Sequence, residues 1–303
     1  MTWFEEFDKL SAARFPELEV LREESMEKHT TFRIGGPVRR MARPGSAEAC
    51  AALLELAEER GWPAFLLGNG SNLLAADGVI DLLAVHTGRM DWMYRTGEGR
   101  IRAGAGLRLA RLASFAMEEG LGGLAFAHGI PGTLGGAVCM NAGAYGGEMK
   151  QVLDRVTAWF PDEGIRRLSA DELDLGYRRS LFSKKRGAVL EAELLLAAEP
   201  AGTIRAAMDD FSRRRREKQP LEYPSAGSTF KRPEGHFAGA LIEQCGLKGL
   251  RVGGAQVSEK HAGFVVNTGG ASCADVLALI GEVQRIVRER TGVELEPEVK
   301  VVP

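Results

Sequence analysis

The stretch of sequence that decides the fold is GIPGTLGGAVCMNAGAYGG, residues 129–147. Seven of these residues are glycine and none carries a charge. Glycine lets a ligand approach the backbone closely, and bare backbone N–H groups form concave anion-binding sites. A flexible linker is the alternative, but linkers favour Ser and other polar residues, whereas this stretch contains Ile130, Leu134, Val138 and Met140. We therefore predict a loop that wraps a phosphate-bearing cofactor.

A second glycine turn, Gly68–Asn72, directly follows the predicted strand 63–67. It would present backbone donors and small polar side chains at the end of that strand, which suits a pyrophosphate or a ribityl chain. The chain lacks both the GxGxxG fingerprint that opens a helix and the P-loop pattern. Taken alone, such a turn is more often a hairpin turn than a ligand site. Paired with residues 129–147, it is interpreted as a second cofactor contact.

The composition is that of an ordinary globular protein of two or three domains. The chain has 303 residues, 45% of them apolar, and a net charge of −2, so no basic field indicates nucleic-acid binding. No apolar run reaches the ~18 residues of a membrane span, and the acidic N-terminus lacks the apolar segment of a signal peptide. The four widely spaced cysteines suit buried thiols in a reducing cytosol. We expect a cytoplasmic protein without a metal site.

Hydrophobic periodicity predicts an α+β protein with mixed sheets. Residues 1–28 are expected to form one or two short helices. Further helices are predicted over 47–60, 107–119, 203–218, 238–245 and 272–290, and strands over 38–43, 63–67, 79–85, 100–106, 152–160, 188–197, 263–267 and 299–302. Ser46 and Ser272 are the predicted N-caps of two helices, the latter with Asp275 at the capping-box position. Pro220 and Pro224 mark a linker into a last domain.

Three polar clusters are candidates for chemistry, and each has a structural alternative. In residues 177–182 a guanidinium would grip a carboxylate bidentately, or the two arginines are solvated at a loop. In residues 225–233 small residues precede two cations, which suits a phosphate or carboxylate, or the segment is a Ser-rich turn. In residues 295–300 a carboxylate opens the final strand, where an exposed glutamate is the commoner outcome.

Two further features have a structural interpretation beside a functional one. The run Arg213–Arg216 lies at the end of a predicted helix, where it would bind a nucleotide diphosphate or nucleic acid, or be solvated at the negative helix terminus. For His261 we favour a structural or supporting role over a catalytic one.

Taken together, these segments resemble a known family. Residues 29–36, 68–74, 129–147, 177–182, 225–233, 252–267 and 295–301 occur in the order and spacing of the UDP-N-acetylenolpyruvoylglucosamine reductases, flavoenzymes of bacterial peptidoglycan synthesis. The resemblance covers nearly the whole chain, and the short connection between Ala188 and the helix at 203 resembles the family form that lacks a segment with a mobile tyrosine. It implies a vanillyl-alcohol-oxidase type FAD-binding fold with two α+β subdomains, 1–88 and 89–218, and a C-terminal α+β substrate-binding domain, 219–295. Residues 296–303 would be able to return to the first subdomain.

The resemblance also implies the cofactors. FAD would be bound non-covalently, and NADPH would be the hydride donor. Residues expected to contact FAD are Gly68, Asn69, Gly70, Ser71, Asn72, Gly129, Ile130, Pro131, Gly132, Thr133, Gly135, Gly136, Asn141, Ala142 and Gly143. Residues 29–36 would support the same cofactor.

The catalytic residues implied by the resemblance are Arg178, Ser228 and Glu298. Arg178 would neutralise the substrate carboxylate, and Glu298, if burial keeps it protonated, would hydrogen-bond to it. Ser228 would donate the proton that quenches the substrate carbanion, assisted by Lys231 or a neighbouring cation. Tyr177, Arg214, Lys218 and Arg232 would lie near the carboxylate or the UDP, although some relatives carry Asn at the position of Arg232.

The partners implied are small molecules alone: NADPH and the enolpyruvyl ether of UDP-N-acetylglucosamine, which would be reduced to UDP-N-acetylmuramate by a cytoplasmic monomer. Two alternatives stay open from the sequence. One is another FAD oxidoreductase of the same fold, such as an alcohol or sugar oxidase. The other is a non-catalytic nucleotide-binding protein that uses the arginine run, whose affinity would fall steeply with salt.

Overall fold

The computed structural model describes all residues, 1–303, and the chain packs into two compact units. The first unit contains residues 1–22, 39–69 and 81–213, and the second contains 23–38, 70–80 and 214–303. Each unit is therefore assembled from segments that are far apart in the sequence. The three domains expected from the resemblance stay a prediction.

A four-stranded sheet with two helices forms one part of the first unit. Its strand order is β1-β2-β5-β3, and β3 and β5 are parallel. The strands are β1 (Glu19–Ser25), β2 (Pro37–Arg43), β3 (Ala64–Leu67) and β5 (Ile80–His86), and the helices are α1 (Trp3–Arg14) and α2 (Ala47–Glu59). Ser46 Oγ accepts the N–H of Ala49 at 3.1 Å, which confirms the predicted N-cap of α2. Arg40, almost fully buried, holds both carboxylate oxygens of Asp8 in α1, at 2.6 and 2.8 Å.

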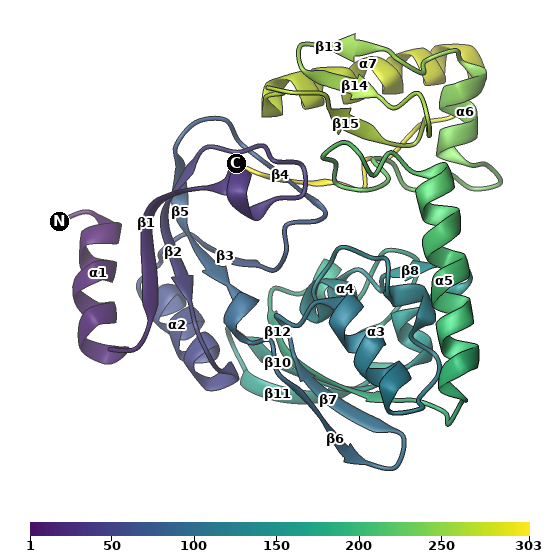
Figure 1. The fold of residues 1–303 in the computed structure, drawn as a ribbon. Coiled ribbons are helices and arrows are strands. Elements are labelled where there is room, and N and C mark those ends of the chain that lie inside the picture. Colours follow the sequence, from purple (N-terminus) through teal and green to yellow (C-terminus); the bar gives the residue numbers. More distant parts are fainter. The chain divides into compact units, whose positions relative to one another are not determined.

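A five-stranded antiparallel sheet forms the other part of the first unit (Figure 1). Its order is β11-β10-β12-β7-β6. The strands are β6 (Met93–Gly97), β7 (Arg100–Gly104), β10 (Leu153–Phe160), β11 (Gly164–Ser169) and β12 (Ala188–Leu195). Helix α4 (Leu134–Cys139) packs on β7 and β12, and α3 (Leu109–Glu118) lies beside it. Ion pairs join β7 to the neighbouring strand β12, through Arg100 with Glu193 and Arg102 with Glu191, and Arg100 also pairs with Asp154 of β10, one strand further along the sheet.

The second unit contains a three-stranded sheet covered by a long helix. The strands β13 (Arg251–Val252), β14 (Ala255–Val257) and β15 (Val265–Asn267) are antiparallel, and α7 (Cys273–Thr291) packs on them beside α6 (Ala238–Gln244). Strands β4 (Leu73–Ala75) and β16 (Lys300–Val302) form a separate parallel pair. The hydrophobic core of the second unit combines Phe32, Ile34 and Leu74 with apolar side chains from residues 226–299.

Several shorter elements complete the chain. Helix α5 (Ala201–Lys218) begins in the first unit and ends in the second. The two-residue strands β8 (Gly143–Ala144) and β9 (Gly147–Glu148) form a small hairpin. Short 3-10 turns lie at Met26–His29, Thr87–Arg89, Ala125–Ala127, Met149–Gln151, Asp171–Leu173 and Leu181–Ser183. No helix combines the length and the apolar composition that crossing a membrane requires.

The α+β class is confirmed, and so are the predicted helices from residue 47 onward, with shifted ends. The capping box of α7 is present as predicted, because Ser272 and Asp275 exchange hydrogen bonds at 3.0 Å. Of the one or two short helices expected in residues 1–28, α1 is present, whereas residues 19–25 form the strand β1, which pairs with β2 and was not expected. Pairing with β2 outweighs the helix propensity of the glutamates of this segment.

Candidate active site

The glycine-rich stretch 129–147 contains the helix α4 instead of the continuous loop that the sequence predicted. Three apolar side chains of α4 are buried: Leu134, Ala137 and Val138. The N–H of Gly135 donates to Ala105 O at 2.9 Å, and a Cβ atom added to Gly135 would lie 2.9 Å from the Cβ of Ala105. Glycine is therefore needed here for close packing, and burial of one helix face outweighs its low helix propensity.

Within the first unit, the beginning of the second glycine turn lies against the segment that leads into α4. Asn69 Nδ2 donates to Pro131 O at 2.5 Å, and a Cβ atom added to Gly68 would overlap the hydroxyl oxygen of Thr133. The two glycine segments singled out by the sequence are thus neighbours. The N–H groups of Gly132 and Thr133 donate to no protein atom, so they are available to an anion.

The rest of this turn, Gly70–Asn72, belongs to the second unit. Gly70 has a φ of +58°, and a Cβ atom there would overlap the carbonyl oxygen of His29. Asn72 Nδ2 donates to the backbone carbonyl of Glu298 at 3.1 Å. The side chain of Asn72 is therefore linked to the backbone of a predicted catalytic residue, in the segment just before β16.

Arg178 lies in a tight turn between Gly176 and Arg179, whose backbones bond to each other at 3.1 and 3.2 Å. Its φ of +52° is left-handed, a conformation that costs a non-glycine residue about 1–2 kcal/mol. Arg178 Nη2 donates to Gly143 O at 3.1 Å, and its guanidinium carbon lies 5.2 Å from the centre of the exposed Tyr177 ring. The turn is thus held on the glycine-rich stretch, and such strain is typical of functional sites.

Asn141 is fully buried, and both polar atoms of its side chain form hydrogen bonds within the protein. The amide nitrogen donates to Glu148 Oε2 at 3.0 Å and to Gly176 O at 3.1 Å, and the amide oxygen accepts the N–H of Lys150 at 2.9 Å. A cofactor contact of Asn141 therefore stays a prediction for its backbone alone.

Ser228 and Glu298 are brought together on two neighbouring segments of the second unit. Glu298 N donates to Thr229 O at 2.8 Å, and Phe230 forms an antiparallel bridge with Pro297. Ser228 is exposed and its hydroxyl lies 3.2 Å from Phe230 O, whereas Glu298 is half-buried. Ser228 is thus the sequence neighbour of the residue whose carbonyl accepts the Glu298 N–H.

The buried Thr229 holds the segment that contains Ser228 on the strand β15 and the residues just before it. Its N–H donates to Gly263 O at 2.8 Å, and its hydroxyl accepts the N–H of Val265 at 2.9 Å. The His261 ring packs edge-on against Phe264, with centroids 5.1 Å apart. Burial lowers the pKa of His261, so the neutral imidazole accepts the N–H of Gly263 at 3.1 Å. This geometry supports the structural role favoured for His261.

The cationic side chains of the second unit that were predicted to assist catalysis or bind substrate differ in their surroundings. Lys231 pairs with Glu296 at 2.5 Å, so its charge is already matched. The guanidinium of Arg232 lies 4.2 Å from the centre of the Phe237 ring, whose side chain is exposed. Arg214 and Lys218 are exposed on the last turns of α5. Tyr177 and Arg178 belong to the first unit, whereas these cations, Ser228 and Glu298 belong to the second.

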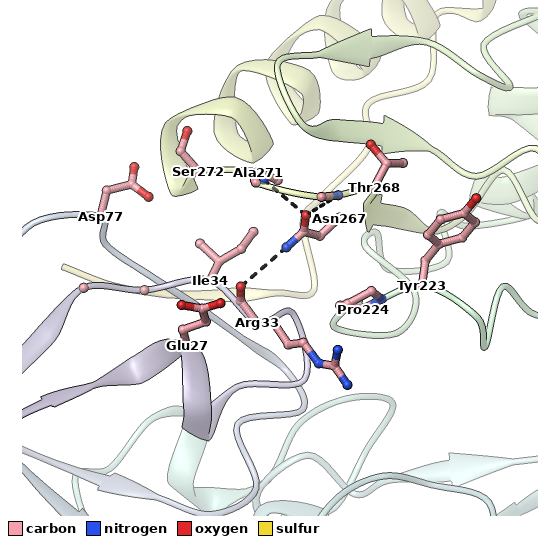
Figure 2. Close-up of a pocket in the computed structure, with 14 residues that line it drawn as sticks. Glu27, Arg33, Ile34, Asp77, Tyr223, Pro224, Asn267, Thr268, Ala271 and Ser272 are labelled. Atoms are coloured by element: carbon pink, nitrogen blue, oxygen red, sulfur yellow. Dashed lines mark hydrogen bonds between the residues drawn. The ribbon is translucent and has the colours of Figure 1, made fainter.

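A cavity of about 570 Å³ lies in the second unit (Figure 2). Its polar lining includes Glu27, Arg33 and Asn267, and the Asn267 amide donates to Arg33 O at 3.4 Å. Asp77 accepts the first N–H groups of α7. Residues 33–36, part of the segment predicted to support the cofactor, line this cavity. None of the predicted catalytic or substrate residues does, and neither does any of the residues expected to contact FAD in 68–72 and 129–143, so we do not assign it to the active site.

Comparisons with known proteins agree with these segments. A family model of an FAD binding domain matches residues 38–169, and the model of the C-terminal domain of UDP-N-acetylenolpyruvoylglucosamine reductase matches residues 219–302. The reductase of that name from Agathobacter rectalis is 48% identical over 98% of this chain and 98% of its own. The one from Syntrophomonas wolfei is 50% identical over 92% of this chain and 93% of its own. The crystal structure of the Thermus caldophilus reductase is 37% identical, with a TM-score of 0.79 over 95% of this chain and 99% of its own.

Proposed function

The chain belongs to the UDP-N-acetylenolpyruvoylglucosamine reductase family, and on this premise we propose that it reduces the enolpyruvyl group of UDP-N-acetylglucosamine enolpyruvate to give UDP-N-acetylmuramate. It is an oxidoreductase with an FAD-binding domain. The observation that carries the proposal is the backbone hydrogen bond from Glu298 N to Thr229 O, which joins the segments that contain Ser228 and Glu298. The relatives give no support to the alternative of an alcohol or sugar oxidase.

The residues present fit FAD. Gly68 and Gly135 have no room for a side chain, and the N–H groups of Gly132 and Thr133 are free to bind phosphate oxygens. Residues 68–72 and 129–143 would hold the cofactor without a covalent bond. When bound, FAD supplies hydride chemistry that no side chain of the protein provides.

Arg178 is proposed to neutralise the substrate carboxylate. Negative charge develops on that carboxylate as the double bond is reduced, and a fixed guanidinium in a water-poor site stabilises such charge strongly. The contact of Nη2 with Gly143 O orients the side chain before substrate arrives. Glu298, when protonated, would donate a hydrogen bond to the same carboxylate.

Ser228 is proposed to donate the proton to the carbanion-like carbon. Its exposed hydroxyl is a weak acid, so correct placement matters more than its acidity. Because Lys231 is already paired with Glu296, we assign no assistance to it. Tyr177, Arg214, Lys218 and Arg232 are proposed to bind the carboxylate end or the diphosphate of the substrate, in a cytoplasmic monomer that uses NADPH.

The test is anaerobic absorbance of the flavin band. NADPH is expected to bleach the band, and UDP-N-acetylglucosamine enolpyruvate is expected to restore it without oxygen. Bleaching without return would refute this substrate. In Ser228→Ala the bleaching serves as an internal control: it should keep its rate, while the return slows at least a hundredfold. Equal slowing of both steps would show that Ser228 is structural.

A further inference from the structure

The turn that carries Arg178 is held from both sides by the glycine-rich stretch. Gly176, two residues before Arg178, accepts the Asn141 amide at 3.1 Å. Ser180, two residues after it, donates its hydroxyl to Cys139 O at 2.7 Å. Both anchoring side chains are fully buried, so water cannot replace these bonds without opening the packing.

The two anchors are built differently. Asn141 reaches across to Gly176 and also fixes its own segment, because it contacts Glu148 and the backbone of Lys150. Ser180 combines its bond to Cys139 with a local bond from Phe182 N at 3.3 Å. A turn bonded at one end alone would pivot about that end, whereas two bonds on opposite sides of Arg178 prevent rotation.

We propose that Asn141 and Ser180 are positioning residues, which hold Arg178 in the orientation that meets the substrate carboxylate. This inference rests on the proposed function, and it gives the Asn141 side chain a role other than cofactor binding. Arg178 in its left-handed conformation would relax once either bond is lost, because its backbone strain is maintained by the surrounding contacts. Displacing a charged group by about 1 Å can cost ~100-fold in rate.

Ser183 provides a matched control three residues along the same turn. It is exposed, and its hydroxyl accepts the N–H of Ser180 at 3.1 Å without contacting the glycine-rich stretch. Ser180→Ala and Ser183→Ala therefore remove the same atom from the same turn, but only Ser180→Ala breaks the anchor. Asn141→Gly removes the amide without adding strain at its φ of +40°.

The first readout is kinetic, measured on the flavin-loaded protein. Ser180→Ala and Asn141→Gly should each slow reoxidation by UDP-N-acetylglucosamine enolpyruvate by about 10- to 100-fold. In Ser180→Ala, which changes none of the residues expected to contact FAD, flavin reduction by NADPH should stay within about twofold of the wild type. Ser183→Ala should resemble the wild type. In an Arg178→Ala background, Ser180→Ala should add almost nothing, because the group it positions is gone. The proposal would be overturned if Ser180→Ala slowed flavin reduction and flavin reoxidation equally, or if its effect on reoxidation added fully to that of Arg178→Ala.

The second readout does not depend on activity. Hydrogen exchange followed by mass spectrometry should show faster exchange over residues 173–179 in Ser180→Ala and Asn141→Gly than in Ser183→Ala, which frees only the N–H of Ser180 itself. Unchanged exchange in that segment would refute the anchoring. If the wild type itself fails to turn over the enolpyruvyl substrate, the proposed function and the catalytic part of this inference fall together, while the exchange result still decides whether the anchors exist.

Discussion

Gly68→Ala is expected to separate the two glycine segments. The added Cβ atom would lie about 1 Å inside ordinary contact with the Thr133 hydroxyl oxygen. Thr133 is 5% exposed and β-branched, so its side chain has little freedom to turn away. Moving the segments apart by about 1 Å would stretch the 2.5 Å bond from Asn69 to Pro131 beyond hydrogen-bonding range. Overpacking and the lost bond together cost about 2–4 kcal/mol.

Urea unfolding followed by tryptophan fluorescence measures this loss, because all four tryptophans belong to the first unit: Trp3, Trp62, Trp92 and Trp159. Gly202→Ala is the matched control, since a Cβ atom there meets nothing within 4 Å. It should change the free energy of unfolding by less than about 1 kcal/mol. Flavin retained per chain should fall in Gly68→Ala alone.

The double variant Gly68→Ala/Thr133→Ala removes the oxygen that the new Cβ atom would meet. It should therefore recover most of the stability lost in Gly68→Ala, beyond the sum of the two single changes. If Gly68→Ala is as stable as Gly202→Ala, or if Thr133→Ala brings no recovery, the close approach of the two segments is not what requires glycine at residue 68.

Three further predictions concern stability. Burial lowers the pKa of His261, so the folded state prefers the neutral ring. The free energy of unfolding should therefore fall as the pH drops below about 6.5. His261→Gln should flatten that pH dependence in urea titrations followed by circular dichroism. Ser272→Ala removes the α7 N-cap that bonds to Asp275 N, which should cost about 1 kcal/mol by the same assay; an unchanged midpoint would contradict the cap. Asp8→Asn leaves the almost fully buried Arg40 with no full counter-charge from α1, which should cost about 3 kcal/mol by tryptophan fluorescence, whereas Asp162→Asn, at an exposed residue with no ion pair, should not.

The elements with local signals could be predicted from the sequence. Helix α7 begins at Ser272 with Asp275 three residues on, and α2 begins at Ser46. These signals depend on neighbouring residues only, so they need no knowledge of the fold. Strand β1 lacks such a signal, because residues 19–25 are rich in glutamate and become a strand through pairing with β2.

The candidate site was predictable as a set of residues but not as an arrangement. The glycine segments were identified from composition, whereas the bond from Asn69 to Pro131 joins residues 62 positions apart. The spacing of Leu134, Ala137 and Val138 at i, i+3 and i+4 is the signal that would have indicated α4. For Ser180 and Asn141 no sequence signal exists, because their anchoring role depends on burial and on partners that only the fold supplies.

The discontinuous second unit has a consequence for the order of folding during synthesis. Strand β4 at residues 73–75 finds its partner β16 only at 300–302, and the core around Phe32 and Ile34 needs side chains beyond residue 226. At translation rates of about 5–20 residues per second, β4 leaves the ribosome roughly 10–45 s before its partner exists. The first unit has all its segments once Arg213 is made. A nascent chain should therefore complete its first unit early, while β4 and the segment around Phe32 and Ile34 stay without their packing partners until translation nears its end.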